Sequence, residues 1–137
     1  KPRFVVCDEP TSMLDVSIRI SIMDLMLNLA KDLEVSYLYI THDLAVARYM
    51  CDRIAVMFNG KIVEIAETEE LLSNPIHPYT KRLISSIPIP DPSYKRERYE
   101  LDFTELDSII KNNSNNDPMV EVKANHFVAT HDIKGTL

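Results

Sequence analysis

The sequence predicts an α/β fold built around a strand–helix–strand unit. Three successive segments carry this prediction: an apolar run at Phe4–Cys7, a segment of helical periodicity at Val16–Leu33, and a second strand-like run at Ser36–Ile40. A strand, a crossover helix and a second strand form a right-handed unit whose two strands run parallel. The carboxyl ends of both strands are therefore expected at one edge of a single sheet, where open α/β folds bind ligands.

The first run is continuously apolar and ends abruptly at Asp8-Glu9. Such a run predicts a strand that is buried on both faces, as in a parallel sheet. Cys7, at its end, is expected to be a small buried hydrophobic residue. The only other cysteine is Cys51, and two cysteines indicate a reducing compartment rather than a disulfide framework.

The segment from Val16 to about Leu33 places apolar residues on a wide arc of a helix. One face and the positions beside it carry Ile18, Ile22, Leu25, Met26, Leu29 and Leu33, then Ile20, Met23, Leu27 and Ala30. A helix with so wide an apolar arc is expected to be largely buried against other elements. Asp15 directly precedes this segment and is a good N-cap residue.

After the second strand the sequence predicts a short helix and a hairpin. The helix is expected at about Leu44–Met50, with Asp43 as its cap. Two apolar strands, at Arg53–Phe58 and Lys61–Ala66, flank Asn59-Gly60, which is the strongest short-range hairpin signal. The hairpin thus adds an antiparallel element to the parallel unit.

The last part of the chain predicts a short α+β extension. Thr68 is expected to cap a helix, and a second helix is expected at Tyr79–Ile87. A proline-rich linker follows the second helix, and a weak helix is expected at about Glu105–Lys111. The final elements are two short strands, at Met119–Lys123 and about Phe127–Thr130.

Composition excludes several classes of function. The chain has 137 residues, of which 45% are hydrophobic and 26% are charged, as in an ordinary globular protein. The 15 Lys and Arg residues against 21 Asp and Glu residues give a net charge of -6, so no nucleic-acid partner is expected. We expect neither a membrane span nor a secretory signal. Since no Met precedes Lys1, the chain is expected to begin inside a longer protein.

Two acids at the end of the first strand are the strongest candidates for chemistry. A carboxylate in the position of Asp8 can hold Mg²⁺, usually through water, beside nucleotide phosphates. A second carboxylate, Glu9, can orient or deprotonate an attacking water molecule. Alternatively, both acids simply begin a solvated loop.

The segment Thr41-His42-Asp43, after the second strand, is the other candidate. His42 can donate a hydrogen bond to a terminal phosphate, although a single histidine after a strand is more often structural. Asp15 likewise has two roles that can coexist, as a helix cap and as part of a functional loop.

Taken in order, these motifs closely resemble the second half of an ABC-type nucleotide-binding domain, which is the C-terminal half of a P-loop NTPase. The resemblance rests on the apolar strand, Asp-Glu-Pro-Thr-Ser-Met-Leu-Asp, the helix, the next strand and Thr-His-Asp. It places the Walker B element at Phe4–Glu9, the D-loop at Ser12–Asp15 and the switch histidine at His42. The D-loop of this family usually reads Ser-Ala-Leu-Asp, so Met13 is a small departure.

The resemblance implies a role for each site residue. Asp8 would bind Mg²⁺ through water, Glu9 would be the catalytic base, and His42 would contact the γ-phosphate. Asp15 would communicate across the interface of an ATPase dimer. Together these roles imply an ATPase.

The segment from Glu69 to Lys81, with its His-Pro-Tyr-Thr, resembles the extension of the oligopeptide, dipeptide and nickel uptake ATPases. Pro118–Val122 and His126–Ala129 resemble the terminal segment of the same family. The implied division is a C-terminal half of an ABC ATPase domain at residues 1–74 and an importer-type extension at residues 75–137.

This narrower resemblance implies an ATP-hydrolysing subunit of an ABC importer, which couples hydrolysis of ATP to uptake of oligopeptides or dipeptides. ATP and Mg²⁺ would be its cofactors. Its partners would be a second ATPase subunit, identical or paralogous, and transmembrane permease subunits. It would lie peripherally at the cytoplasmic face of the cell membrane.

Two departures from the family concern cofactors. Many of its members carry a cysteine-rich insert, able to hold an iron–sulfur cluster, and a further cysteine near the end. Here no cysteine follows Cys51, and Thr130 stands at that last position. Because a cluster needs thiolate ligands, no iron–sulfur cluster is expected.

The phosphate-binding loop Gly-x-x-x-x-Gly-Lys-Ser/Thr and the Leu-Ser-Gly-Gly-Gln signature do not occur in these 137 residues. The backbone donors and the lysine that neutralise the phosphates of ATP belong to that loop. The chain by itself is therefore expected to bind ATP weakly and to hydrolyse none measurably.

Two other interpretations remain open from the sequence. ATPases of DNA repair and chromosome organisation share the Walker B, D-loop and histidine order, but the acidic charge and the His77–Lys81 segment disfavour them. The segment from Thr68 onward is alternatively a regulatory or dimer-contact module without catalysis.

Overall fold

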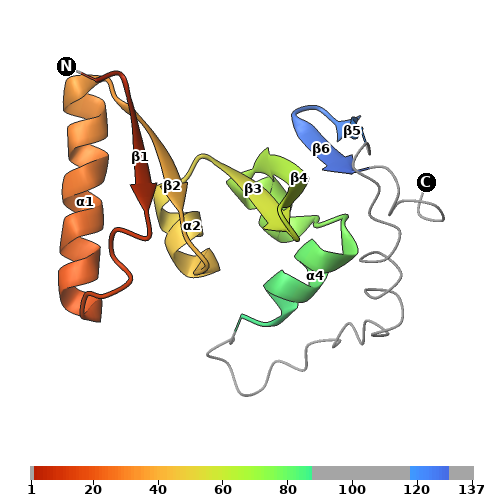
Figure 1. The fold of residues 1–137 in the computed structure, drawn as a ribbon, viewed down its shortest axis with the longest axis horizontal. Coiled ribbons are helices and arrows are strands. Elements are labelled where there is room, and N and C mark those ends of the chain that lie inside the picture. Colours follow the sequence, from red (N-terminus) through yellow and green to blue (C-terminus); the bar gives the residue numbers. More distant parts are fainter. Residues whose placement is uncertain (1, 88–117, 130–137) are drawn as a thin grey trace. The chain divides into compact units, whose positions relative to one another are not determined.

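The computed structural model describes residues 2–87 and 118–129. The chain divides into two compact units, unit 1 at Lys1–Cys51 and unit 2 at Asp52–Leu137 (Figure 1). The weak helix expected at Glu105–Lys111 lies outside the described residues, as does most of the proline-rich linker. Among the described residues, no helix combines the length and the apolar character needed to cross a membrane.

Unit 1 is the predicted strand–helix–strand unit followed by one short helix. Its elements are β1 (Phe4–Asp8), α1 (Val16–Leu33), β2 (Ser36–Ile40) and α2 (Leu44–Met50). The two strands are parallel and in register from the pair Phe4 and Ser36 to the pair Asp8 and Ile40. Figure 1 shows α1 running alongside this pair of strands. The expected parallel arrangement is confirmed, and both carboxyl ends lie at one edge.

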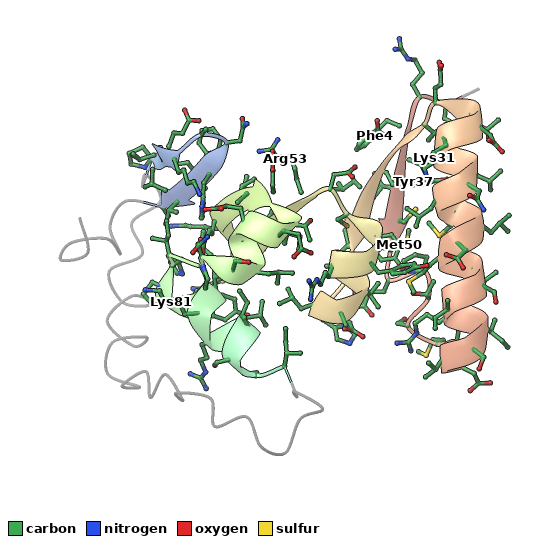
Figure 2. All side chains as sticks on the ribbon, turned by 180° about the vertical axis from the view of Figure 1, so that it is seen from behind. Phe4, Lys31, Tyr37, Met50, Arg53 and Lys81 are labelled. Carbon is green, nitrogen blue, oxygen red and sulfur yellow. The ribbon has the colours of Figure 1, made fainter. Side chains whose placement is uncertain are left out.

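The expectation that α1 is largely buried is wrong. Met23 is its only buried residue, whereas its large apolar side chains are substantially exposed, namely Val16, Ile18, Ile20, Leu25, Leu29 and Leu33. Figure 2 shows many side chains projecting from the helix, away from the strands. The physical reason is that a sheet of two strands covers only a narrow stripe of a helix.

The strand β1 is likewise not buried on both faces. Phe4, labelled in Figure 2, and Val6 are each 57% exposed, while Val5 and Cys7 are half-buried. The alternation follows from the period of two in a strand, because only one face of this two-stranded sheet is covered. Cys7 is therefore half-buried rather than buried as expected.

The helix caps agree with the sequence in part. Asp43 caps α2, since its Oδ1 accepts hydrogen bonds from the backbone N–H groups of Ala45 at 2.9 Å and Val46 at 3.4 Å. Asp15 occupies the N-cap position of α1, but its side chain makes no capping hydrogen bond. The expectation for Thr68 is wrong, because Glu67 takes the N-cap position of the next helix and Thr68 is its first helical residue.

In its described residues, unit 2 is a four-stranded antiparallel sheet with two short helices. Its elements are β3 (Arg53–Phe58), β4 (Lys61–Glu67), α3 (Thr68–Ser73), α4 (Pro78–Ser85), β5 (Met119–Lys123) and β6 (His126–Ala129), and the strand order is β3-β4-β6-β5. The predicted hairpin is confirmed. Its turn residues Asn59 and Gly60 have φ of 48° and 79°, and a type I′ turn needs positive φ at both positions. Leu71, Ala66 and Val128 lie in the core of the unit, each 0% exposed.

The units divide at Cys51 and Asp52, whereas the implied functional division falls after residue 74. That functional division remains a prediction. In the structure, β6 pairs with β4 through Glu64 opposite Val128 and Ile65 opposite Phe127. The segment from Thr68 onward therefore shares its sheet with β3 and β4, which precede it.

Candidate functional site

The carboxyl edge of the two-stranded sheet brings Glu9 and His42 together. Glu9 follows β1, and its backbone N–H donates to the carbonyl oxygen of Ile40 at 2.9 Å, which continues the ladder. The φ of Glu9 is 44°, in the left-handed region, so the chain turns sharply at this residue. His42 Nδ1 lies 2.8 Å from Glu9 Oε1, within hydrogen-bond distance. The proximity predicted from the parallel topology is confirmed.

The electrostatics of His42 follow from this contact. The hydrogen bond to the Glu9 carboxylate, followed by the negative charge of that carboxylate, raises the pKa of His42 above its ordinary value of 6.5. Asp43 raises it further, while partial desolvation and the positive charge of Arg19 oppose the rise. The side chains of His42 and Glu9 are 76% and 44% exposed, so both groups remain accessible to a ligand and to water.

Asp8 is the last residue of β1 and its side chain is exposed. Among the described residues, no side chain forms a hydrogen bond or ion pair with its carboxylate, and no group of three or more His, Cys, Asp or Glu residues is placed to hold a metal ion. Mg²⁺ commonly takes one or two protein carboxylates and completes its octahedron with water and substrate phosphates. The donor chemistry of Asp8 therefore fits Mg²⁺ held partly by a nucleotide.

The predicted D-loop is a compact turn. Ser12 donates from both its backbone N–H and its Oγ to the carbonyl oxygen of Glu9, at 3.2 and 3.0 Å. Leu14 N–H donates to the carbonyl oxygen of Thr11 at 3.2 Å. Met13, at the tip, is 96% exposed. Asp15 lies at the far end of the turn, where α1 begins, and makes no hydrogen bond with Glu9 or His42.

Two residues that the sequence reasoning did not single out anchor this turn. Thr11 is 3% exposed, and its Oγ1 lies 2.8 Å from the hydroxyl oxygen of Tyr39 on β2. The contact ties the start of the turn to the neighbouring strand. The only sequence signal for the contact of Thr11 with Tyr39 is the position of Tyr39 near the end of the second predicted strand, which was expected to lie beside the first strand.

A buried polar cluster lies in unit 2 and was also missed. Glu64, on β4, is 0% exposed, and its carboxylate accepts from the backbone N–H groups of Ile76 at 2.8 Å and His77 at 3.0 Å. Its Oε1 also lies 2.8 Å from Nε2 of His126, which is 1% exposed. The signal was a glutamate inside an apolar strand, because charged residues are almost never fully buried unless paired.

The rim of this cluster carries a second pair. Nδ1 of His126 lies 3.6 Å from Glu70 Oε1, and Lys123 Nζ donates to both carboxylate oxygens of Glu70 at 2.8 and 2.9 Å. The hydrogen bond from Lys123 is the main reason that the pKa of Glu70 is lowered below 4.5. His77 accepts a hydrogen bond at Nδ1 from Tyr79 N–H at 3.1 Å, so its side chain caps α4. The cluster thus joins β4, α3, α4 and the β5–β6 hairpin.

Part of the chain matches a known protein family. Residues 63–109 match the family described as the oligopeptide/dipeptide transporter, C-terminal region. The described part of this match runs from β4 to α4 and includes Glu64 and His77. The resemblance of this segment to the peptide-importer extension is confirmed.

Individual relatives narrow the comparison. The chain is 48% identical over 131 residues to the oligopeptide transport ATP-binding protein OppF of Streptococcus pyogenes serotype M1, covering 93% of this chain and 41% of the relative. It is 46% identical over 127 residues to OppF of Bacillus subtilis, covering 93% and 41%. It is 44% identical over 128 residues to the dipeptide transport ATP-binding protein DppF of Lactococcus lactis subsp. cremoris, covering 93% and 40%.

These matches confirm that the chain is related to the ATP-binding subunits of oligopeptide and dipeptide transporters. The chain spans about two fifths of the length of these relatives, 41% for the first. The similarity extends over 93% of this chain.

Proposed function

We propose that the full-length protein containing this chain is the ATP-hydrolysing subunit of an ABC importer for oligopeptides or dipeptides. The observation that carries the proposal is the 2.8 Å contact between Glu9 and His42 at the carboxyl edge of two parallel strands. The similarity to transport ATP-binding proteins supports the choice of a transporter over an ATPase of DNA repair or chromosome organisation.

In this proposal, Glu9 and His42 have different roles in the hydrolysis of ATP. The Glu9 carboxylate accepts a proton from a water molecule, or orients it, as the water attacks the γ-phosphate of ATP. Because Nδ1 of His42 faces Glu9, Nε2 is the ring nitrogen that remains to donate to a phosphate oxygen. A raised pKa keeps more of the imidazole protonated near neutral pH, and a protonated ring can use both nitrogens as donors.

Asp8 is the residue that would hold Mg²⁺, which supplies positive charge beside the phosphates when bound. The exposed D-loop turn, with Asp15 at its end, would meet a second ATPase subunit. Transmembrane permease subunits complete the proposed assembly at the cytoplasmic face of the membrane. Residues 75–137 form the importer-type extension, and the ATPase part comprises residues 1–74.

The test is ATP turnover by the purified full-length protein that contains these residues. Glu9→Gln is expected to lower turnover by about 100-fold or more, the range for loss of a general base, while Mg-ATP binding stays close to that of the unaltered protein. Glu34→Gln is the matched control, because Glu34 is an exposed glutamate at the end of α1. Unchanged turnover in Glu9→Gln would remove Glu9 from the role of base.

The substrate class needs its own measurement. Cells lacking the gene are expected to lose uptake of labelled di- and oligopeptides, and the unaltered gene should restore it while the Glu9→Gln variant should not. Normal peptide uptake in the deletion strain, with no other importer active, would refute the assignment to peptide import.

A further inference from the structure

We propose that Arg19 is a positioning residue that joins the D-loop turn to the turn carrying His42, an inference that rests on the proposed function. Arg19 lies in the first turns of α1, and its backbone N–H donates to the carbonyl oxygen of Asp15 at 2.8 Å. Its side chain therefore starts from a fixed point directly after the D-loop. The inference concerns what the guanidinium contacts from there.

On one side, the guanidinium binds the D-loop turn. Nη2 of Arg19 donates to the carbonyl oxygen of Leu14 at 3.2 Å and lies 3.5 Å from that of Ser12. These two carbonyls flank Met13, the exposed tip of the turn. A single planar group that contacts both sides of the tip restricts the backbone of the whole turn, including the peptide leading to Asp15.

On the other side, the guanidinium faces the turn that carries His42. Nη1 of Arg19 lies 3.7 Å from Oδ2 of Asp43. The other carboxylate oxygen of Asp43, Oδ1, is already used to cap α2. Asp43 thus has one oxygen on the helix and one toward Arg19, and His42 is the residue directly before it.

The two contacts close a ring around the candidate site. Glu9 leads into the D-loop turn, Arg19 links that turn to Asp43, and His42 returns to Glu9 through the 2.8 Å contact. A shift of the D-loop on meeting a second subunit would therefore move Arg19, and through Asp43 it would move His42 relative to Glu9. Arg19 is thereby placed to connect subunit contact with alignment of the base.

The buried Nε of Arg19 gives a further argument for the positioning role. Arg19 is 26% exposed, and its Nε is buried with no hydrogen-bond partner among the described residues. An unpaired buried N–H is unfavourable, so packing alone does not account for an arginine here. The terminal nitrogens span two loops while Nε stays unpaired, and this geometry needs the length and planar fork of arginine.

The test compares variants of the full-length protein by steady-state ATPase kinetics. Arg19→Met is expected to lower kcat by about 10- to 100-fold, as for a misaligned catalytic group, with KM for ATP within about twofold. Arg19→Lys retains the charge but not the fork, so it is expected to lower kcat nearly as much. Lys31→Met, a cation in the last turn of the same helix, is the control and should leave kcat unchanged.

A second readout separates positioning from a merely structural role. In NMR titrations of the 137-residue chain, Arg19→Met is expected to raise the pKa of His42, because it removes a positive charge that lowers it. Asp43→Asn should lower that pKa and leave the α2 cap in place, since an amide oxygen can still accept at Oδ1. Arg19→Lys should leave the pKa close to that of the unaltered chain.

The outcomes are distinguishable. Full kcat in Arg19→Lys, or an unchanged kcat and an unchanged His42 pKa in Arg19→Met, would overturn the positioning role. Loss of both ATP binding and kcat in the two Arg19 variants would indicate a folding defect. If Asp43→Asn then kept full kcat, that result would also overturn the positioning role of Arg19. If Glu9→Gln keeps full turnover, the proposed function itself fails, whatever the Arg19 variants do.

Discussion

Replacing the buried Glu64 by alanine is expected to destabilise unit 2 by about 3–5 kcal/mol, because a buried carboxylate is removed and the groups that it binds lose their partner. The carboxylate has three partners: Ile76 N–H at 2.8 Å, His77 N–H at 3.0 Å and His126 Nε2 at 2.8 Å. Each donor left unsatisfied in the interior costs about 1–3 kcal/mol, and relaxation keeps the three losses from adding in full. The loss is a large share of the roughly 5–15 kcal/mol that stabilises a typical domain.

The assay is urea unfolding of the 137-residue chain, followed by circular dichroism, together with amide exchange at Ile76 and His77. Glu64→Ala should lower the unfolding midpoint and speed exchange at both amides, since their acceptor is removed. Glu67→Ala is the matched control, because Glu67 is exposed on the same strand and makes no side-chain capping bond. Its effect should stay within about 0.5 kcal/mol, as for surface positions.

A double substitution sharpens the reasoning. Replacing Glu64 by methionine and His126 by leucine removes both partners of the buried pair, so part of the loss should be recovered relative to Glu64→Met alone. The two backbone donors remain unpaired, so full recovery is not expected. If Glu64→Ala changes the free energy of unfolding by less than about 1 kcal/mol and leaves both amides protected, the cluster does not stabilise unit 2 as argued here.

Three further predictions concern single contacts. The raised pKa of His42 means that its contribution to stability is present below 6.5 and is lost as the pH rises through the folded value; Glu9→Gln should return that pKa toward 6.5 in an NMR titration. The lowered pKa of Glu70 has the opposite sign, because its contribution is present above 4.5 and is lost as the pH falls through the folded value; Lys123→Met should raise that pKa, measured by carboxyl NMR. Asp43→Ala removes the cap of α2 and should destabilise unit 1 by about 1 kcal/mol in urea unfolding, and an effect near zero would count against the cap.

Local periodicity predicted the elements of unit 1 well. The bounds of α1, β2 and α2 are those expected, at Val16–Leu33, Ser36–Ile40 and Leu44–Met50. The contact of Glu9 with His42 was also predictable although 33 positions separate them, because the right-handed crossover rule leaves one arrangement for a strand–helix–strand unit. For this contact, the rule on crossover handedness is enough to predict the proximity without a structure.

The sequence did not predict exposure or caps reliably. Apolar periodicity in α1 shows which residues can be buried, whereas the area that covers them depends on how many strands lie beside the helix. Thr68 and Glu67 are adjacent, and a shift of one residue at a helix start falls within the ordinary uncertainty of helix ends. The roles assigned to Asp8, Glu9, His42 and Asp15 remain predictions, because catalysis is not tested by geometry alone.

The sequence by itself determined the strand–helix–strand order, the hairpin turn at Asn59-Gly60 and the convergence of Glu9 with His42. Each of these follows from short-range chemistry or from the handedness of a connection. Tertiary structure alone decided that Glu64 meets His126, 62 positions away, and that Arg19 lies between the D-loop carbonyls and Asp43. Such contacts depend on the three-dimensional path of the chain between their partners, and neither residue spacing nor hydrophobic period encodes that path.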